Sequence, residues 1–400
     1  MTAATEGNVR VGTTAFRRIN VALFCAGFVT FVTLYDVQPL LPLFAEEFKI
    51  SPAMASLPLS CSTIALALGM LIAGTVSETL GRRQVMTVAL FLTSLLAMAT
   101  FFSHSFASLL AVRLLQGLVL AGVPSVAMAY LGEEMDAQAI GHAMGLYISG
   151  NAVGGMSGRI GSALLCSYVP WHSAIALVGL FSLLLSILFL KCLPPSTNFH
   201  HRPFKLRYLF TSLYQHLHDP GLLCLYGLAF LSMGGFISLY NYIGFRLLAA
   251  PYNLSHYQVS LIFLVYLLGS FSSGVVGSLI HRFGRPLMIR TALATMLAGT
   301  LITLVGSLPL IVAGVGVFTC GFFSAHAIAS SWVGRRALTA KAQASSLYLF
   351  AYYLGSSISG TAGGLFWQHY GWNGVAVMIT LLLLTAFGVA TLLLLMPLVE

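Results

Sequence analysis

Apolar runs long enough to cross a lipid bilayer follow one another along nearly the whole chain, and only short polar breaks separate them. A helix crosses about 30 Å of hydrocarbon with roughly 20 residues. The chain has 400 residues, of which 58% are hydrophobic and 7% charged, and its mean hydropathy is +0.91. Soluble domains carry about 25% charged residues, and helices that are apolar on every side are stable in lipid. The pattern therefore predicts an all-α integral membrane protein, with the lipid bilayer as its main solvent.

By this length criterion the sequence contains twelve spans in two sets of six. They are expected at residues 20–44, 53–77, 84–103, 106–130, 140–166 and 170–192, and at 221–248, 257–281, 286–306, 308–331, 341–367 and 373–397. The longest polar break lies at the middle of the chain. The predicted organisation is an N-terminal segment 1–19, a six-helix bundle 20–192, a linker 193–220 and a second six-helix bundle 221–400.

The polar stretch 1–18 leads into an apolar run longer than that of a secretory signal, so it is expected to be retained. Basic residues are kept on the cytoplasmic side during insertion. Of the nineteen Lys and Arg, two lie within spans and two, Lys49 and Arg246, lie in loops of one side. The other fifteen fall in the N-terminal segment, the linker and the loops of the opposite side, which places both termini in the cytoplasm. Because the net charge of +9 is explained by this asymmetry, no nucleic-acid partner is expected.

The six cysteines are scattered without the spacing of a metal site, and no HExxH or GxSxG motif occurs. The cysteines are expected to be small packing residues. The sequence therefore predicts neither a metal, nor a cofactor, nor an enzymatic activity.

The two halves repeat one another in three places. Phe31–Asp36 (FVTLYD) returns as Phe236–Asn241 (FISLYN), and the loop Gly74–Arg83 (GTVSETLGRR) returns as Gly277–Pro286 (GSLIHRFGRP). In the fifth span, Leu146-Tyr147 and Gly154, followed by Trp171, match Leu347-Tyr348, Gly355 and Trp372 of the second half at a constant offset. Parallel repeats of this kind are typical of transporters whose binding site lies between the halves.

These motifs resemble the major facilitator superfamily over essentially the whole chain. GTVSETLGRR is similar to the family's loop G-x-x-x-D-R-x-G-R-R/K, with an acid retained at Glu78 and a threonine in place of the first Arg. The resemblance implies a gate on the cytoplasmic side formed by Gly74, Glu78, Gly81, Arg82 and Arg83 and, in the second half, by Gly277, Arg282, Gly284 and Arg285.

Two further motifs resemble the proton-driven exporters of this family. Arg113-Leu-Leu-Gln116-Gly117 is similar to an R-x-x-x-G element associated with proton coupling, and the fifth span is rich in glycine. The resemblance implies alternating access, proton antiport, a bacterial inner membrane and a chain that acts as a monomer. Glycines four residues apart let another backbone approach closely, either as static packing or as a sliding gate surface. These packing positions are Gly150, Gly154 and Gly158, with Gly355 in the second half.

Three ionisable residues fall clearly inside predicted spans: Asp36, Arg113 and Arg159. Each costs at least about 2.5 to 3.5 kcal/mol at the centre of a bilayer, so each needs a partner or a wet cavity. With a rise of about 1.5 Å per residue, all three lie near one level of the outer half. We expect Asp36 to face Arg113, shared with Arg159, and to couple protons to transport. The alternative is a permanent ion pair that only holds spans 1 and 4 together.

The remaining polar positions of the predicted cavity are aromatic rings and amides. Such side chains suit a moderately apolar or hydroxylated solute, although tyrosines in spans also serve helix packing. His326 in span 10 could relay a proton or be a packing residue. The cavity candidates are Tyr35, Gln38, Asn151, Tyr240, Asn241, Tyr266, Tyr348 and Tyr352.

The sequence thus predicts a secondary transporter that exports a small organic solute, such as a drug or sugar-like compound, in exchange for protons. Proton-coupled uptake and a non-transporting sensor stay open as alternatives. A channel would need a continuous polar pore, which the sequence lacks.

Overall fold

The computed structural model describes residues 8–136, 138–199 and 206–396, with the backbone alone for 206–210. In that part of the chain every regular element is a helix, apart from an isolated bridge between Val9 and Met135. The all-α prediction is confirmed. Nine helices among the described residues are long and apolar enough to cross a membrane. One of them is α16, which contains the non-helical Gly371 (φ 58°), so the predicted number of twelve crossings stays a prediction.

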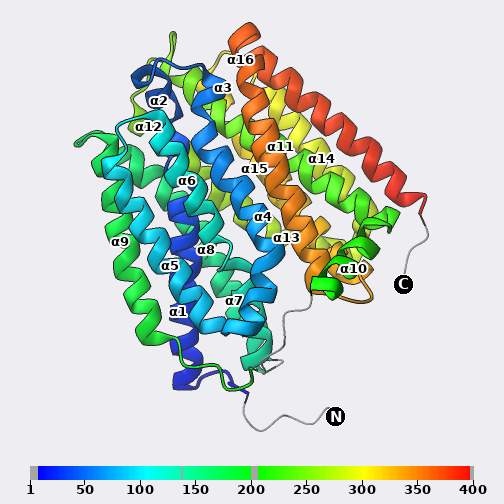
Figure 1. The fold of residues 1–400 in the computed structure, drawn as a ribbon. Coiled ribbons are helices and arrows are strands. Elements are labelled where there is room, and N and C mark those ends of the chain that lie inside the picture. Colours follow the sequence, from blue (N-terminus) through cyan, green and yellow to red (C-terminus); the bar gives the residue numbers. More distant parts are fainter. Residues whose placement is uncertain (1–7, 137, 200–205, 397–400) are drawn as a thin grey trace. The chain divides into compact units, whose positions relative to one another are not determined.

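The helices divide into two compact units, and the first contains the residues up to Val37 and those from Leu68 to the linker. In this unit α1 packs against α8, α9 and α5, and α5 packs against α9 and α6 (Figure 1). Its elements are α1 (Thr14–Tyr35), the second half of α4 (Leu57–Leu80), α5 (Arg82–Ala99), η2 (Thr100–Phe102), α6 (Phe106–Leu120), α7 (Pro124–Glu134), α8 (Ala139–Leu165) and α9 (Trp171–Cys192).

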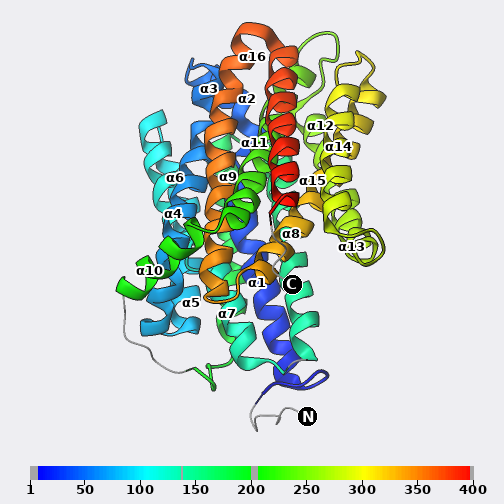
Figure 2. The ribbon, with the colours of Figure 1, turned by 90° about the vertical axis from the view of Figure 1, so that its right-hand side faces the viewer.

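The second unit contains Gln38–Ala67 and the residues from Leu206 onward. Here α11 lies along α16, and α15 packs against both α14 and α13 (Figure 2). Its elements are η1 (Gln38–Leu40), α2 (Leu41–Glu47), α3 (Pro52–Ala55), the first half of α4, α10 (Leu206–Leu217), α11 (Pro220–Leu248), α12 (His256–Ser260), η3 (Leu261–Val265), α13 (Tyr266–Phe283), α14 (Arg285–Ile302), α15 (Leu308–Arg336) and α16 (Lys341–Leu394).

The helices follow the predicted spans with ends shifted by a few residues, and α10 lies inside the predicted linker. Proline explains two interruptions, since it lacks the amide hydrogen that a helix interior uses. α1 ends at Tyr35 before Pro39, and α6 gives way to α7 at Pro124. The predicted domain boundaries stay predictions.

Hydroxyl side chains join the segment Gln38–Ala67 to α16 inside the second unit, a feature that the sequence did not indicate. The hydroxyls of Thr63 and Ser357 lie 2.7 Å apart, and those of Ser60 and Thr361 lie 2.9 Å apart. Ser357 also donates to the carbonyl of Ser60 at 3.0 Å. We call these four residues the hydroxyl seam.

Candidate functional site

A buried ion pair lies where α1 ends. Asp36 follows the last residue of α1, and its Oδ1 lies 3.1 Å from the guanidinium of Arg113 on α6. Neither side chain has any exposed surface. The sequence predicted that Asp36 and Arg113 lie at the same depth of the membrane. The structure brings these two candidates together.

Arg113 has acceptors besides the carboxylate. Its guanidinium donates to the backbone carbonyls of Thr33 at 2.8 Å and Leu34 at 2.6 Å, and to Oε1 of Gln116 at 2.7 Å. The last carbonyls of a helix lack intrahelical donors and carry partial negative charge. Arg113 thus caps α1, and its N–H groups keep hydrogen-bond acceptors whether or not Asp36 is ionised.

The second carboxylate oxygen of Asp36, Oδ2, is buried without a hydrogen-bond partner among the described residues. A buried acceptor without a donor costs free energy, and an ionised one costs more. A proton on this oxygen would turn it into a donor. The site can therefore hold a proton at Oδ2 while Oδ1 keeps its contact with Arg113.

Arg159 on α8 lies beside the end of α1 that carries this pair. Its guanidinium carbon lies 3.9 Å from the centre of the Tyr35 ring, and it donates to the carbonyl of Gly155 at 2.8 Å. That Asp36 is shared with Arg159 stays a prediction. α8 also contacts the aspartate through Ser162, whose hydroxyl donates to the Asp36 backbone carbonyl at 2.6 Å.

Glycines allow α8 to approach α1 this closely. A Cβ added at Gly158 would lie 2.5 Å from the carbonyl oxygen of Val32, and one at Gly150 or Gly154 would overlap a backbone carbonyl of α1 as well. In the second unit a Cβ at Gly355 would overlap the carbonyl of Phe230. These glycines are therefore closely packed against the neighbouring helix. That the two helices slide along this surface during gating stays a prediction.

Asn151 lies on the same helix, where its amide packs against Gly27 of α1. Asn151 and Tyr35 are the cavity candidates of the first unit, and the other six belong to the second unit.

In the second unit, Asn241 on α11 accepts a hydrogen bond of 2.8 Å from the side-chain amide of Gln38. The hydroxyl of the neighbouring Tyr240 lies 2.7 Å from that of Thr319, and its ring centre lies 5.0 Å from that of Tyr266. The asparagine that matches Asp36 in the sequence repeat therefore takes part in a neutral amide pair.

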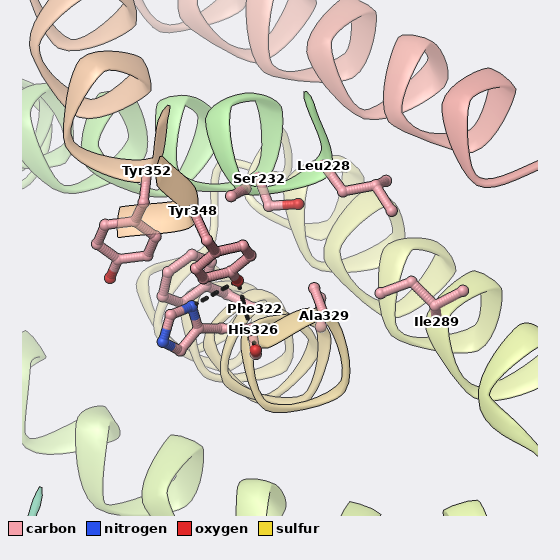
Figure 3. Close-up of a pocket in the computed structure, with 10 residues that line it drawn as sticks. Leu228, Ser232, Ile289, Phe322, His326, Ala329, Tyr348 and Tyr352 are labelled. Atoms are coloured by element: carbon pink, nitrogen blue, oxygen red, sulfur yellow. Dashed lines mark hydrogen bonds between the residues drawn. The ribbon is translucent and has the colours of Figure 1, made fainter. Parts of the chain in front are cut away.

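A small cavity lies between α11, α14, α15 and α16 (Figure 3). Nδ1 of His326 lies 3.0 Å from the hydroxyl of Tyr348, and the His326 ring centre lies 4.9 Å from that of Tyr352. These three side chains come together although the sequence offered His326 only as a relay or packing residue. The cavity is lined by Leu228, Ala229, Ser232, Ile289, Phe322, Ala325, His326, Ala329, Tyr348 and Tyr352.

The loop motif of the first half is organised around Arg82. Its guanidinium donates to Glu133 on α7 at 2.8 Å, to the carbonyl of Gly74 at 3.2 Å and to the Ser77 hydroxyl, while Glu78 lies 3.8 Å away. Glu133 was not singled out from the sequence, because it lies far along the chain at the end of another helix. Two further motif positions have local roles: Gly81 adopts φ 96°, and Arg83 donates to the carbonyl of Leu190 at 3.0 Å.

The matching loop of the second half lacks such a network within the described residues. Arg282 lies over the ring of Phe283, Gly284 adopts φ 77°, and a Cβ at Gly277 would meet nothing within 4 Å. Nε of Arg285 is buried without a hydrogen bond to any residue that the structure describes. The ion pair of this region is formed instead by Arg336 at the end of α15 and Asp219 at the start of α11, at 2.7 Å. The described residues contain no group of three or more His, Cys, Asp or Glu that could hold a metal ion.

Comparison with known proteins decides the family. The sequence model of the Major Facilitator Superfamily matches residues 21–324 of the chain. The chain belongs to the major facilitator superfamily. Superfamily relatives include YybF of Bacillus subtilis, an uncharacterized MFS-type transporter that is 49% identical over 378 residues, which are 94% of each chain. The inner membrane transport protein YnfM of Escherichia coli is 46% identical over 383 residues, 96% of this chain and 92% of its own.

Solved structures of other transporters share the fold. The nucleoside transporter NupG has a TM-score of 0.78 at 12% identity and covers 94% of this chain and 99% of its own. A D-xylose-proton symporter has a TM-score of 0.71 at 14% identity and covers 94% and 97%. The chain is therefore a multi-pass membrane transporter, a secondary transporter by its fold, and not an enzyme.

Proposed function

We propose that this transporter exports a small organic solute across the bacterial inner membrane in exchange for protons, by alternating access, with Asp36 as the proton carrier. One observation carries this proposal: the carboxylate of Asp36 is fully buried, with Oδ1 on Arg113 and Oδ2 without a donor among the described residues. A carboxylate with one open oxygen can gain and lose a proton without rebuilding its surroundings.

Arg113 supports the exchange by staying satisfied in both states. When Asp36 is ionised, the pair is neutral overall. When Asp36 is protonated, the guanidinium keeps the carbonyls of Thr33 and Leu34 and the amide oxygen of Gln116. The free-energy difference between the two states is therefore smaller than for an isolated buried pair, in which loss of one charge leaves the other uncompensated.

The neutrality of the pair also bears on the solute. A cationic solute would have to displace Arg113 to use the charge of Asp36, and Arg159 lies beside the same helix end. A neutral, zwitterionic or anionic solute fits this charge pattern better. Proton-coupled uptake is the alternative, and it uses the same pair with the solute moving in the opposite direction.

The test is transport in proteoliposomes with an imposed pH gradient, using the solute that stabilises the purified protein most in a thermal-shift screen. We expect Asp36→Asn to abolish the response to the gradient while solute exchange at equal pH persists, because asparagine cannot release a proton. Unimpaired gradient-driven transport in Asp36→Asn would remove this residue from the coupling role.

The matched control is Glu46→Gln, which neutralises an exposed carboxylate on α2 and should leave the pH response unchanged. The sign of the gradient that drives accumulation separates export from uptake. Solute flux that saturates with concentration would also exclude a sensor without transport activity.

A further inference from the structure

Aromatic rings from three long helices and η3 form a continuous series inside the second unit. At its centre the rings of Phe322 and Phe236 are stacked, with centres 3.8 Å apart and planes inclined by 18°. On one side Phe322 is followed by His326 at 6.2 Å, and on the other Phe236 is followed by Tyr240 at 4.9 Å. We call this series the aromatic column, and its members are Tyr348, His326, Phe322, Phe236, Tyr240 and Phe263.

The column runs along the helices rather than across them. Tyr348 lies in the first turns of α16 after Lys341, close to the end of α15 at Arg336. Phe263 lies in η3, which follows α12 at the opposite end of the unit, and its ring stacks on Tyr240 at 5.2 Å. The rings therefore lie at successive depths of the unit, and those at the Tyr348 end line the cavity.

The cavity adjoins the Tyr348 end of this column. Small side chains leave space beside the rings there, with Ala229 from α11 and Ala325 and Ala329 from α15. In Figure 3 the rings of Phe322, His326, Tyr348 and Tyr352 lie together, and Leu228 and Ile289 lie across from them. Apolar cavities that carry few polar groups are the usual form of a small-molecule site.

His326 supplies polar atoms beside the rings that line the cavity. Nδ1 of His326 forms a hydrogen bond of 3.0 Å with the Tyr348 hydroxyl, while Nε2 makes no hydrogen bond to a described residue. If position 326 served only for stacking, phenylalanine would do equally well, and it has no polar atom that needs a hydrogen bond. An imidazole held by a tyrosine, with its other nitrogen open, is suited to hydrogen-bond a ligand.

We propose that the aromatic column and the adjoining cavity bind the planar ring of a hydroxyl-bearing aromatic solute, whose hydroxyl pairs with Nε2 of His326. This inference rests on the proposed transport function, because it names the class of solute carried. A hydroxyl both donates and accepts, so it matches Nε2 in either tautomer of the imidazole. The ring of the solute stacks on the column, as aromatic pairs do at centre distances of about 4.5 to 7 Å.

The test uses 2-naphthol as the probe, with decahydro-2-naphthol as a saturated control of similar size and the same hydroxyl. Binding to the purified full chain is measured by thermal shift and by titration calorimetry. We expect 2-naphthol to bind saturably and to raise the melting temperature, while the saturated alcohol does neither. Equal binding of the two alcohols would overturn the stacking site.

Three variants locate the site. Phe322→Leu removes the central ring, and we expect it to weaken 2-naphthol binding about 2- to 10-fold, the range of a lost aromatic pair. His326→Phe keeps a ring and removes the nitrogen, with an expected loss of about 2- to 10-fold, the range of a lost hydrogen bond. Phe271→Leu, an exposed phenylalanine of α13, is the matched control and should bind as the unmodified chain does.

If Phe322→Leu or His326→Phe fails to fold, Tyr348→Phe is measured in its place. Tyr348→Phe keeps the aromatic ring and removes only the hydroxyl that hydrogen-bonds to the imidazole. Weaker binding of 2-naphthol to this variant supports the site, and unchanged binding overturns the role of His326. Binding unchanged in all column variants would overturn the inference. Naphthol binding without pH-driven transport would defeat the proposed function while leaving the site. Conversely, pH-driven transport of a solute with which 2-naphthol does not compete would defeat this inference alone.

Discussion

At the residue scale, the two members of the buried pair have unequal numbers of partners. Arg113 contacts the carboxylate, two carbonyls and an amide oxygen, whereas the Asp36 carboxylate has Arg113 as its ion-pair partner among the described residues. We therefore expect Arg113→Leu to lower the stability far more than Asp36→Asn. Breaking a buried pair by removing one partner costs about 3 to 5 kcal/mol in soluble proteins, which is the scale expected for Arg113→Leu.

The measurement is thermal unfolding of both single variants and of the double variant in detergent. Because Arg113 keeps its other acceptors, Asp36→Asn should cost about 1 kcal/mol, the scale of a single hydrogen bond. The double variant should recover part of the loss of Arg113→Leu, since no buried charge is then left without a partner. Equal losses in the two single variants would contradict the capping role of Arg113.

The sequence could indicate this pair because charges in apolar spans are rare and helical rise gives their depth. It could not indicate the direction of each side chain around its helix. Arg159, for example, stacks on the ring of Tyr35, the residue before Asp36. The carbonyls of Thr33 and Leu34 could not be predicted as partners either, since they become free acceptors only because α1 ends at Tyr35.

At the element scale, an ion pair fastens the start of α11 to the end of α15. Burial opposes ionisation of Asp219, but the hydrogen bonds from Arg336 and the Leu222 amide outweigh this and lower the pKa of Asp219 below its usual 3.8. A carboxylate with a lowered pKa in the folded state stabilises the protein above its unfolded pKa and loses this effect as the pH falls.

Asp219→Asn keeps a good helix cap and removes only the charge. We expect it to lower the melting temperature by a constant amount between pH 7 and pH 5, and the difference to shrink as the pH falls below 3.8. Because 29% of the Asp219 side chain is exposed, the loss at pH 7 should stay within about 1 kcal/mol. A difference independent of pH down to pH 3 would assign the effect to packing instead.

Helices were predictable as elements because apolar runs set their lengths and glycines four residues apart indicated close packing. The glycine positions on α8 do face the backbone of α1. Interruptions were harder to place. The hydropathy pattern predicted single spans at 20–44 and 106–130. In the structure each span is divided into two α-helices, because proline lacks the amide hydrogen that a helix interior uses.

At the scale of the whole molecule, the family and the all-α fold followed from motifs and hydropathy, both of which are properties of the chain alone. The grouping of Gln38–Ala67 with the C-terminal helices did not follow. It depends on contacts between residues about 300 positions apart, such as Ser60 with Thr361 and Thr63 with Ser357, and serine and threonine are too common in spans to mark such contacts.

The hydroxyl seam leads to a prediction about the transport cycle. Because α4 continues into the first unit, its first half parts from α16 in one state of alternating access if α4 moves as one helix. Neutral hydroxyl bonds of about 0.5 to 1.5 kcal/mol each are weak enough to break. The Ser60 and Thr361 oxygens lie 2.9 Å apart, so cysteines at these positions should form a disulfide on mild oxidation.

We expect the Ser60→Cys and Thr361→Cys double variant, in a background without the six native cysteines, to lose transport when oxidised and to recover when reduced. The single variants are the controls, and the oxidant should leave their transport unchanged. Full transport by a completely cross-linked double variant would mean that the seam stays closed throughout the cycle, so that α4 and α16 move as one body.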